Sequence, residues 1–146
     1  MTTPQTISPS TPHVLFVCVK NGGKSQMAAG LMRQAVRDDG TDIAVSSAGT
    51  KAGTALNAQS VQSLAEVGVD ISDQVPQQLT EDMVRDADLV VVLGSEAHVE
   101  PVGGTPVEVW ETDEPSLRGI EGAERMALVR DDIAARVGQL QQRLTH

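Results

Sequence analysis

The fold is decided by the stretch His13-Val14-Leu15-Phe16-Val17-Cys18-Val19-Lys20-Asn21-Gly22-Gly23-Lys24-Ser25-Gln26-Met27. The apolar run up to Cys18 predicts a short strand, and the two glycines indicate a tight turn after it. A helix is then expected from about Lys24. Its apolar residues recur at helical spacing at Met27, Ala28, Leu31, Met32 and Ala35.

The chain's only cysteine stands where this strand meets the turn. Gly22 and Gly23 lack a Cβ, so backbone N–H groups can converge on one point. The following helix directs its positive dipole end to the same point, and a lysine stands beside it. Helix N-termini and lysines favour the ionised form of a nearby cysteine. A lone cysteine is most often a small buried hydrophobe, but the position of Cys18 favours an oxyanion site with a thiolate nucleophile.

Length and charge exclude several classes of function. With 146 residues the chain is expected to form one domain over residues 13–146, preceded by a disordered polar tail at residues 1–12. The formal net charge of −9 argues against nucleic acid or an anionic membrane as a partner. It also opposes long-range attraction of an anion, so short-range donors must hold one. A single cysteine permits no internal disulfide, and no apolar run is long enough to span a bilayer, so we expect a cytoplasmic protein.

The rest of the chain alternates strand and helix patterns. Strands are expected at 43–48, 89–93 and 107–110, and the all-apolar run 89–93 predicts a central strand covered on both faces. Helices are expected near 61–68, from Thr80, and at 120–144. The predicted fold class is therefore a three-layer α/β/α protein with a four-stranded parallel sheet. Ligands of such folds lie beyond the carboxyl ends of the strands, where Cys18 and the turn at Asp113 both fall.

A nucleotide-binding P-loop is a rival interpretation of the same stretch. Gly23-Lys24-Ser25 completes the end of that pattern, but Cys18 stands where its first glycine is required. Leu93 is also followed by glycine and serine rather than by a metal-binding aspartate. The match to the P-loop pattern is therefore poor. Stabilisation of the protein by ATP in a thermal-shift assay would support the P-loop interpretation.

Cys18-Val19-Lys20-Asn21-Gly22-Gly23-Lys24-Ser25 resembles the C-x-x-N-x-x-R-S loop of low-molecular-weight protein tyrosine phosphatases and of the arsenate reductases that share their fold. Further likeness extends over almost the whole chain after residue 12, at residues 47–50, 66–72, 79–80, 87–91 and 113–115. The resemblance implies the low-molecular-weight phosphatase-like fold. It is more specific for the fold than for the substrate.

Departures from the family pattern reduce the number of functions that the resemblance allows. Lys24 replaces the loop arginine, which keeps the charge but loses the planar fork that holds a tetrahedral oxyanion, so phosphatase activity should suffer most. Gly23 stands where many members carry a second cysteine, and residues 93–98 lack the resolving pair of thioredoxin-coupled relatives. The cysteine count alone excludes an internal disulfide relay.

The sequence is most similar to the mycothiol-dependent arsenate reductases, the arsenate–mycothiol transferases. This resemblance implies that Cys18 forms an adduct with arsenate, that mycothiol as co-substrate takes the arsenic, and that a mycoredoxin releases arsenite. The lack of aromatic residues between Thr50 and Leu56 agrees with a small oxyanion rather than a phenyl phosphate. The alternatives are a phosphomonoester phosphatase and a non-catalytic oxyanion-binding module.

Roles can be assigned residue by residue on this basis. The expected oxyanion-binding residues are Val19, Lys20, Asn21, Gly22, Gly23 and Lys24, and the expected catalytic residues are Cys18, Lys24, Ser25, Asp113 and Glu114. Asn21 is expected in a left-handed conformation. Ser25 is expected to bond the Cys18 thiolate, to cap the helix, or both. One acid of the turn should protonate the leaving oxygen.

Glu114 occupies the family position of that acid, directly before proline, whereas the shorter Asp113 is easier to hold fixed and is slightly preferred. A turn in which both acids are merely solvated is the remaining alternative. His13 and His98 are too isolated to predict a metal site. No bound cofactor is expected.

Overall fold

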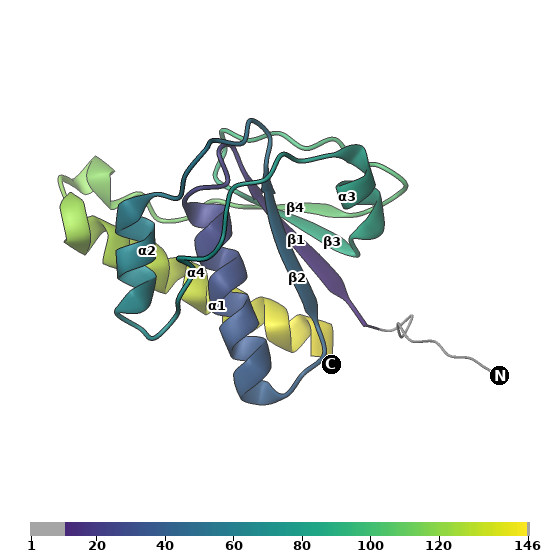
Figure 1. Ribbon diagram of the computed structural model, residues 1–146, viewed down its shortest axis with the longest axis horizontal. Coiled ribbons are helices and arrows are strands. Elements are labelled where there is room, and N and C mark those ends of the chain that lie inside the picture. Colours follow the sequence, from purple (N-terminus) through teal and green to yellow (C-terminus); the bar gives the residue numbers. More distant parts are fainter. Residues whose placement is uncertain (1–10, 146) are drawn as a thin grey trace.

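A computed structural model describes residues 11–145. Its centre is a parallel sheet of four strands in the order β2-β1-β3-β4, which confirms the predicted fold class (Figure 1). The strands are β1 (His13–Cys18), β2 (Ala44–Gly49), β3 (Leu89–Leu93) and β4 (Val107–Trp110). All five residues of β3 are buried between β1 and β4, as its apolar sequence predicted.

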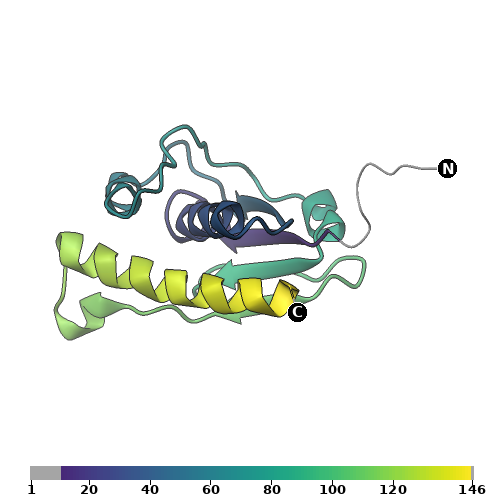
Figure 2. The same ribbon diagram turned by 90° about the horizontal axis from the view of Figure 1, so that it is seen from below.

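The helices cover the two faces of the sheet unequally. One face packs on α1 (Lys24–Asp39), α2 (Ala58–Ala65) and α4 (Gly122–Thr145), and the other on the short α3 (Glu81–Asp86) and the segment that follows β3. Figure 2 shows α4 on one side of the sheet, with its N-terminal part extending beyond the strands. Its buried stripe is the predicted one, Val129, Ile133, Val137 and Leu140, with Leu144 partly buried beside it.

Several element boundaries differ from the expected ones by one or two residues. The second strand begins at Ala44 rather than at Ile43, and the last helix begins at Gly122 rather than at residue 120. Gly119 and Gly122 both have positive φ, which delays the helix start. The expected turn after Glu114 contains a 3-10 helix, η1 (Pro115–Arg118).

The predicted tail at residues 1–12 lies mostly outside the described residues. The two described members of it contact the sheet: Thr11 donates a hydrogen bond to Asp42, and the Pro12 carbonyl accepts one from Ala44. Among residues 11–145, no helix is both long enough and apolar enough to cross a bilayer.

Candidate active site

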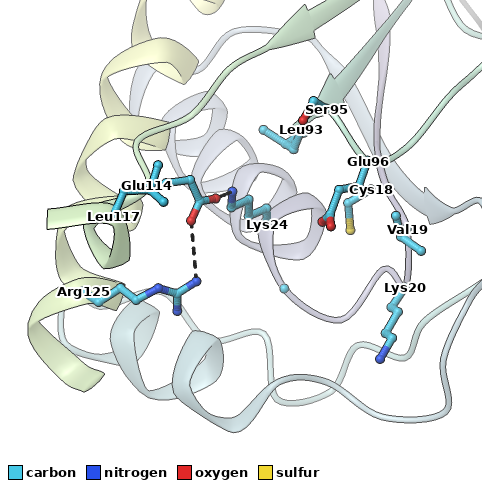
Figure 3. A pocket seen from close by; sticks show the side chains of 12 residues that line it. Cys18, Val19, Lys20, Lys24, Leu93, Ser95, Glu96, Glu114, Leu117 and Arg125 are labelled. Carbon is cyan, nitrogen blue, oxygen red and sulfur yellow. Dashed lines mark hydrogen bonds and ion pairs between the residues drawn. The ribbon is translucent and has the colours of Figure 1, made fainter. Parts of the chain in front are cut away.

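The carboxyl ends of β1 and β3 open into a pocket of about 720 Å³ (Figure 3). We call it the thiol pocket, because the half-buried Cys18 lies in its wall. Parallel strands end at the same edge of the sheet, so β1 and β3 deliver their terminal residues to one place. The lining residues are Cys18, Val19, Lys20, Gly23, Lys24, Leu93, Gly94, Ser95, Glu96, Glu114, Leu117 and Arg125.

The loop between β1 and α1 is held from outside by the segment that follows β2. Carbonyl oxygens of the loop accept backbone hydrogen bonds of 2.7 to 3.0 Å from that segment; the acceptors are Cys18, Val19, Lys20 and Gly22, and the donors are Thr50, Lys51, Gly53 and Asn57. In a trans peptide the C=O of one residue and the N–H of the next point in opposite directions. The loop's N–H groups therefore face away from the 50–57 segment, toward the concave side. This is the donor set that an oxyanion cradle requires.

Close approach of the two segments requires a glycine at the end of β2. A Cβ on Gly49 would lie 2.6 Å from the carbonyl oxygen of Val19 and 2.9 Å from the backbone nitrogen of Asn21. No side chain fits there without moving the loop. Asn21 itself has φ 57°, so the predicted left-handed conformation is found in the structure.

Asn21 and Ser25 form a hydrogen-bond chain that ends on the sulfur. The Asn21 carboxamide is fully buried, and its Nδ2 donates to Ser25 Oγ at 2.7 Å. Ser25 Oγ in turn lies 2.9 Å from Cys18 Sγ. Because Ser25 already accepts from Asn21, its own proton is free to be donated to the sulfur. A charge-assisted bond of this kind stabilises a thiolate.

Two glutamines that the sequence reasoning missed fix the orientation of the Asn21 side chain. Its Oδ1 accepts from the backbone N–H of Gln77 at 2.9 Å and from Gln26 Nε2 at 3.1 Å. With the oxygen occupied by two donors, the amide nitrogen must point to Ser25. Gln26 directly follows the loop in the sequence, so its position could have identified it as a partner of Asn21. Gln77 lies in an irregular segment, and only the tertiary structure brings it here.

The two acids of the turn have different surroundings. Glu114 lines the thiol pocket and is hydrogen-bonded to the ammonium of Lys24, while Arg125 Nη2 lies 3.8 Å from its other oxygen (Figure 3). Asp113 does not line that pocket; it is paired with Arg118 at 2.8 and 3.2 Å. This pairing holds the pKa of Asp113 below its ordinary value.

The geometry places Glu114, and not the slightly preferred Asp113, in the lining of the thiol pocket. The physical reason is side-chain direction: neighbouring residues in extended backbone point to opposite sides. α4 fixes this segment, since Asp132 accepts the N–H of Asp113 at 2.8 Å and Arg136 donates to the Glu111 carbonyl at 2.8 Å. Asp132, on α4, thus has a structural contact.

The histidines have the local contacts expected of structural or surface residues. His13 Nε2 lies 2.8 Å from Ser46 Oγ, and His98 Nε2 lies 2.8 Å from the exposed carboxylate of Glu100. Within the part of the chain that the structure describes, no group of three His, Cys, Asp or Glu side chains is arranged to hold a metal ion.

A half-buried cysteine in a backbone cradle at the edge of a parallel sheet defines a class of thiol-dependent oxyanion enzymes. Residues 13–146 match the family model of the low molecular weight phosphotyrosine protein phosphatases. The chain belongs to this family.

Similar proteins carry two different activities in their names. An arsenate reductase of Shouchella clausii (strain KSM-K16) is 36% identical over 132 residues, covering 85% of this chain and 91% of the relative. A thioredoxin-dependent arsenate reductase of Corynebacterium glutamicum has a TM-score of 0.72 at 29% identity over 92% of this chain, which spans only 62% of that longer one. A tyrosine phosphatase of Erwinia amylovora has a TM-score of 0.75 at 25% identity, over 93% of this chain and 95% of the other.

Proposed function

We propose that this protein is a thiol-coupled arsenate reductase that transfers arsenic to an external low-molecular-weight thiol, mycothiol. The observation that carries the proposal is the single cysteine: Cys18 lies in an oxyanion cradle, and the chain contains no second cysteine to resolve an adduct. Curated relatives named as arsenate reductases support the choice of oxyanion.

The first step is attack of the Cys18 thiolate on arsenic. An S–As bond forms and an As–O bond breaks, and the leaving oxygen takes a proton from Glu114 and departs as water. Ser25 and the loop's N–H groups stabilise the thiolate and the arsenate oxygens. Lys24 adds a positive charge at the same place.

The second step transfers arsenic from the enzyme to mycothiol. The mycothiol sulfur attacks arsenic, and Cys18 leaves as the thiolate, so the oxidation state of arsenic is still five. A mycoredoxin thiol then attacks the mycothiol sulfur. The S–As electron pair stays on arsenic as arsenite, and the two sulfurs form a mixed disulfide. One enzyme cysteine suffices for this sequence.

The lining of the thiol pocket contains no aromatic residue. The 50–57 segment, which borders the same loop, contains none either. Aromatic walls stabilise a bound phenyl group by about 0.5–1.5 kcal/mol beyond burial, whereas an inorganic oxyanion needs none. This supports a small substrate.

The decisive assay follows arsenate-dependent NADPH consumption in three parallel reactions. The first contains mycothiol, mycoredoxin and an NADPH-dependent mycothiol-disulfide reductase, the second contains glutathione, glutaredoxin and glutathione reductase, and the third contains thioredoxin with its reductase. We expect turnover with mycothiol and mycoredoxin and none after Cys18→Ser. Steady turnover with thioredoxin alone would contradict the transfer step. Mass spectrometry after addition of arsenate and thiol detects the transferred adduct, and its absence despite arsenate binding would indicate a non-catalytic binding module.

The second candidate function is a phosphomonoester phosphatase that acts through a cysteinyl phosphate. The family match and the similarity to a tyrosine phosphatase favour it. Hydrolysis of p-nitrophenyl phosphate at a rate above that of arsenate reduction would support this alternative.

A further inference from the structure

All three lysines of the chain lie around the cysteine loop. They are Lys20, Lys24 and Lys51, and the remaining eight basic residues are arginines spread over the rest of the sequence. Lys20 and Lys51 line a second hollow of about 600 Å³, which adjoins the thiol pocket at Lys20 and Gly23. We call it the lysine hollow. Its other lining residues are Gly22, Gly23, Ala52, Gly53, Thr54, Ala55, Leu56 and Asn57.

Backbone contacts fix the two lysines next to each other. Lys51 N–H donates to the Val19 carbonyl at 2.8 Å, and Gly53 N–H donates to the Lys20 carbonyl at 2.9 Å. The lysine hollow and the thiol pocket share Lys20 and Gly23. A charge in one hollow therefore lies close to the other.

The charges of these two lysines are not neutralised by partners. Among residues 11–145, salt bridges involve six arginines, His98 and Lys24, whereas Lys20 and Lys51 form none. The lysine hollow has no carboxylate in its lining. The thiol pocket contains Glu96 and Glu114 against Lys20, Lys24 and Arg125. The two hollows together carry four cations and two acids.

A local positive region matters because the whole chain has a formal charge of −9. That field repels a dianion from most of the surface. We propose that Lys20 and Lys51 form an anion-capture site, which draws a tetrahedral oxyanion to the loop before it enters the cradle beside Cys18. For arsenate the proposal rests on the proposed function. For oxyanion binding as such, it rests only on the placement of charge.

The test uses Lys51→Gln and the double variant Lys20→Gln/Lys51→Gln. The matched control is Arg37→Gln, which removes one exposed positive charge at the opposite end of α1. Arsenate KM and kcat are measured at about 20 mM and about 500 mM ionic strength, where the Debye length falls from roughly 20 Å to below 5 Å. The affinity for inorganic phosphate is measured by calorimetry under the same conditions.

At low salt we expect KM to rise about threefold for Lys51→Gln, with little change in kcat, and about tenfold for the double variant. Phosphate affinity should fall in parallel, and both effects should shrink at high salt. Equal effects of Arg37→Gln and Lys51→Gln would overturn the proposal. So would a change in the KM for the thiol instead of that for arsenate. If no arsenate is reduced at all, the calorimetric arm still decides the capture site, separately from the proposed function.

Discussion

The Lys24 ammonium is hydrogen-bonded to the carboxylate of Glu114, 90 residues further along the chain. Lys24 opens α1 and Glu114 directly precedes η1, so the pair joins the two ends of the site. Lys24 has three donors, and it can keep this bond while donating another to a bound oxyanion. The pair thus holds the lysine and the glutamate together in the lining of the thiol pocket.

Single substitutions of Glu114 and of Asp113 distinguish the contributions of the two acids to kcat. Because Glu114 lines the pocket, Glu114→Gln should lower kcat for arsenate by about 10²- to 10⁴-fold. Asp113→Asn removes the pair with Arg118 outside the pocket and should change kcat less than about threefold. Steady-state kinetics of both variants decides the assignment. The reverse order of effects would restore Asp113 as the acid.

Replacement of Lys24 by arginine should increase phosphatase activity. A guanidinium offers the planar pair of donors that a tetrahedral oxyanion accepts, so we expect p-nitrophenyl phosphate hydrolysis to rise by about tenfold. Lys51→Arg makes the same chemical exchange outside the cradle and serves as the control. Unchanged hydrolysis in Lys24→Arg would mean that the lysine does not limit phosphoryl transfer.

Loss of the hydroxyl at Ser25 should make the thiol less reactive. Ser25→Ala removes the donor 2.9 Å from Cys18 Sγ, and the thiolate loses a charge-assisted hydrogen bond. We expect the rate of alkylation by iodoacetamide at pH 7 to fall several-fold while the melting temperature changes little. Ser116→Ala is the control, since that hydroxyl lies outside the thiol pocket. Equal alkylation rates in both variants would exclude the hydrogen-bond chain from thiol activation.

A side chain at Gly49 should disrupt the loop. The Cβ introduced by Gly49→Ala would lie 2.6 Å from the Val19 carbonyl oxygen, so we expect a destabilisation of about 2 kcal/mol or more. Gly138→Ala in α4 meets nothing within 4 Å and should stabilise by about 0.5–1 kcal/mol. Urea denaturation of both variants, monitored by the fluorescence of Trp110, the only tryptophan, measures the change in the free energy of unfolding.

The pair between Glu108 and Arg143 should make stability depend on pH. Hydrogen bonds from Arg143, with a smaller one from Trp110, hold the pKa of Glu108 below its ordinary value. A carboxyl group whose pKa is lowered in the folded state stabilises the fold at any pH above its unfolded-state pKa of about 4.3. This stabilisation is lost as the pH falls through the folded-state pKa. Glu108→Gln should therefore lower the melting temperature by about 2–4 °C at pH 7, and by progressively less as the pH falls toward 3.

The control for this pair is Asp82→Asn, which removes a partner of Arg85 on an exposed helix surface. Such exposed pairs stabilise little, so its melting temperature should change by less than about 1 °C at either pH. Equal shifts in the two variants, or a Glu108→Gln shift that does not depend on pH, would contradict the assigned ion pair.

Much of the fold follows from local sequence. The apolar run 89–93 required burial on both faces, and the spacing from Val129 to Leu140 required one buried helix stripe. The loop was also readable, since a residue that tolerates positive φ suits position 21 and a residue without a Cβ suits position 22. These are short-range constraints, in which a residue's own shape limits the backbone.

Only the tertiary structure decided which distant residues meet at the loop. Which of Asp113 and Glu114 lines the thiol pocket depends on the direction that each side chain takes from a turn held by α4. Gln77, Arg125 and Lys51 come from three separate segments, and no spacing in the sequence links them to Cys18. Hydrogen bonds and charges act through space over a few ångströms. The sequence therefore predicted Cys18 in its glycine-containing loop as the candidate nucleophile, and the packing of the chain determined which residues surround it.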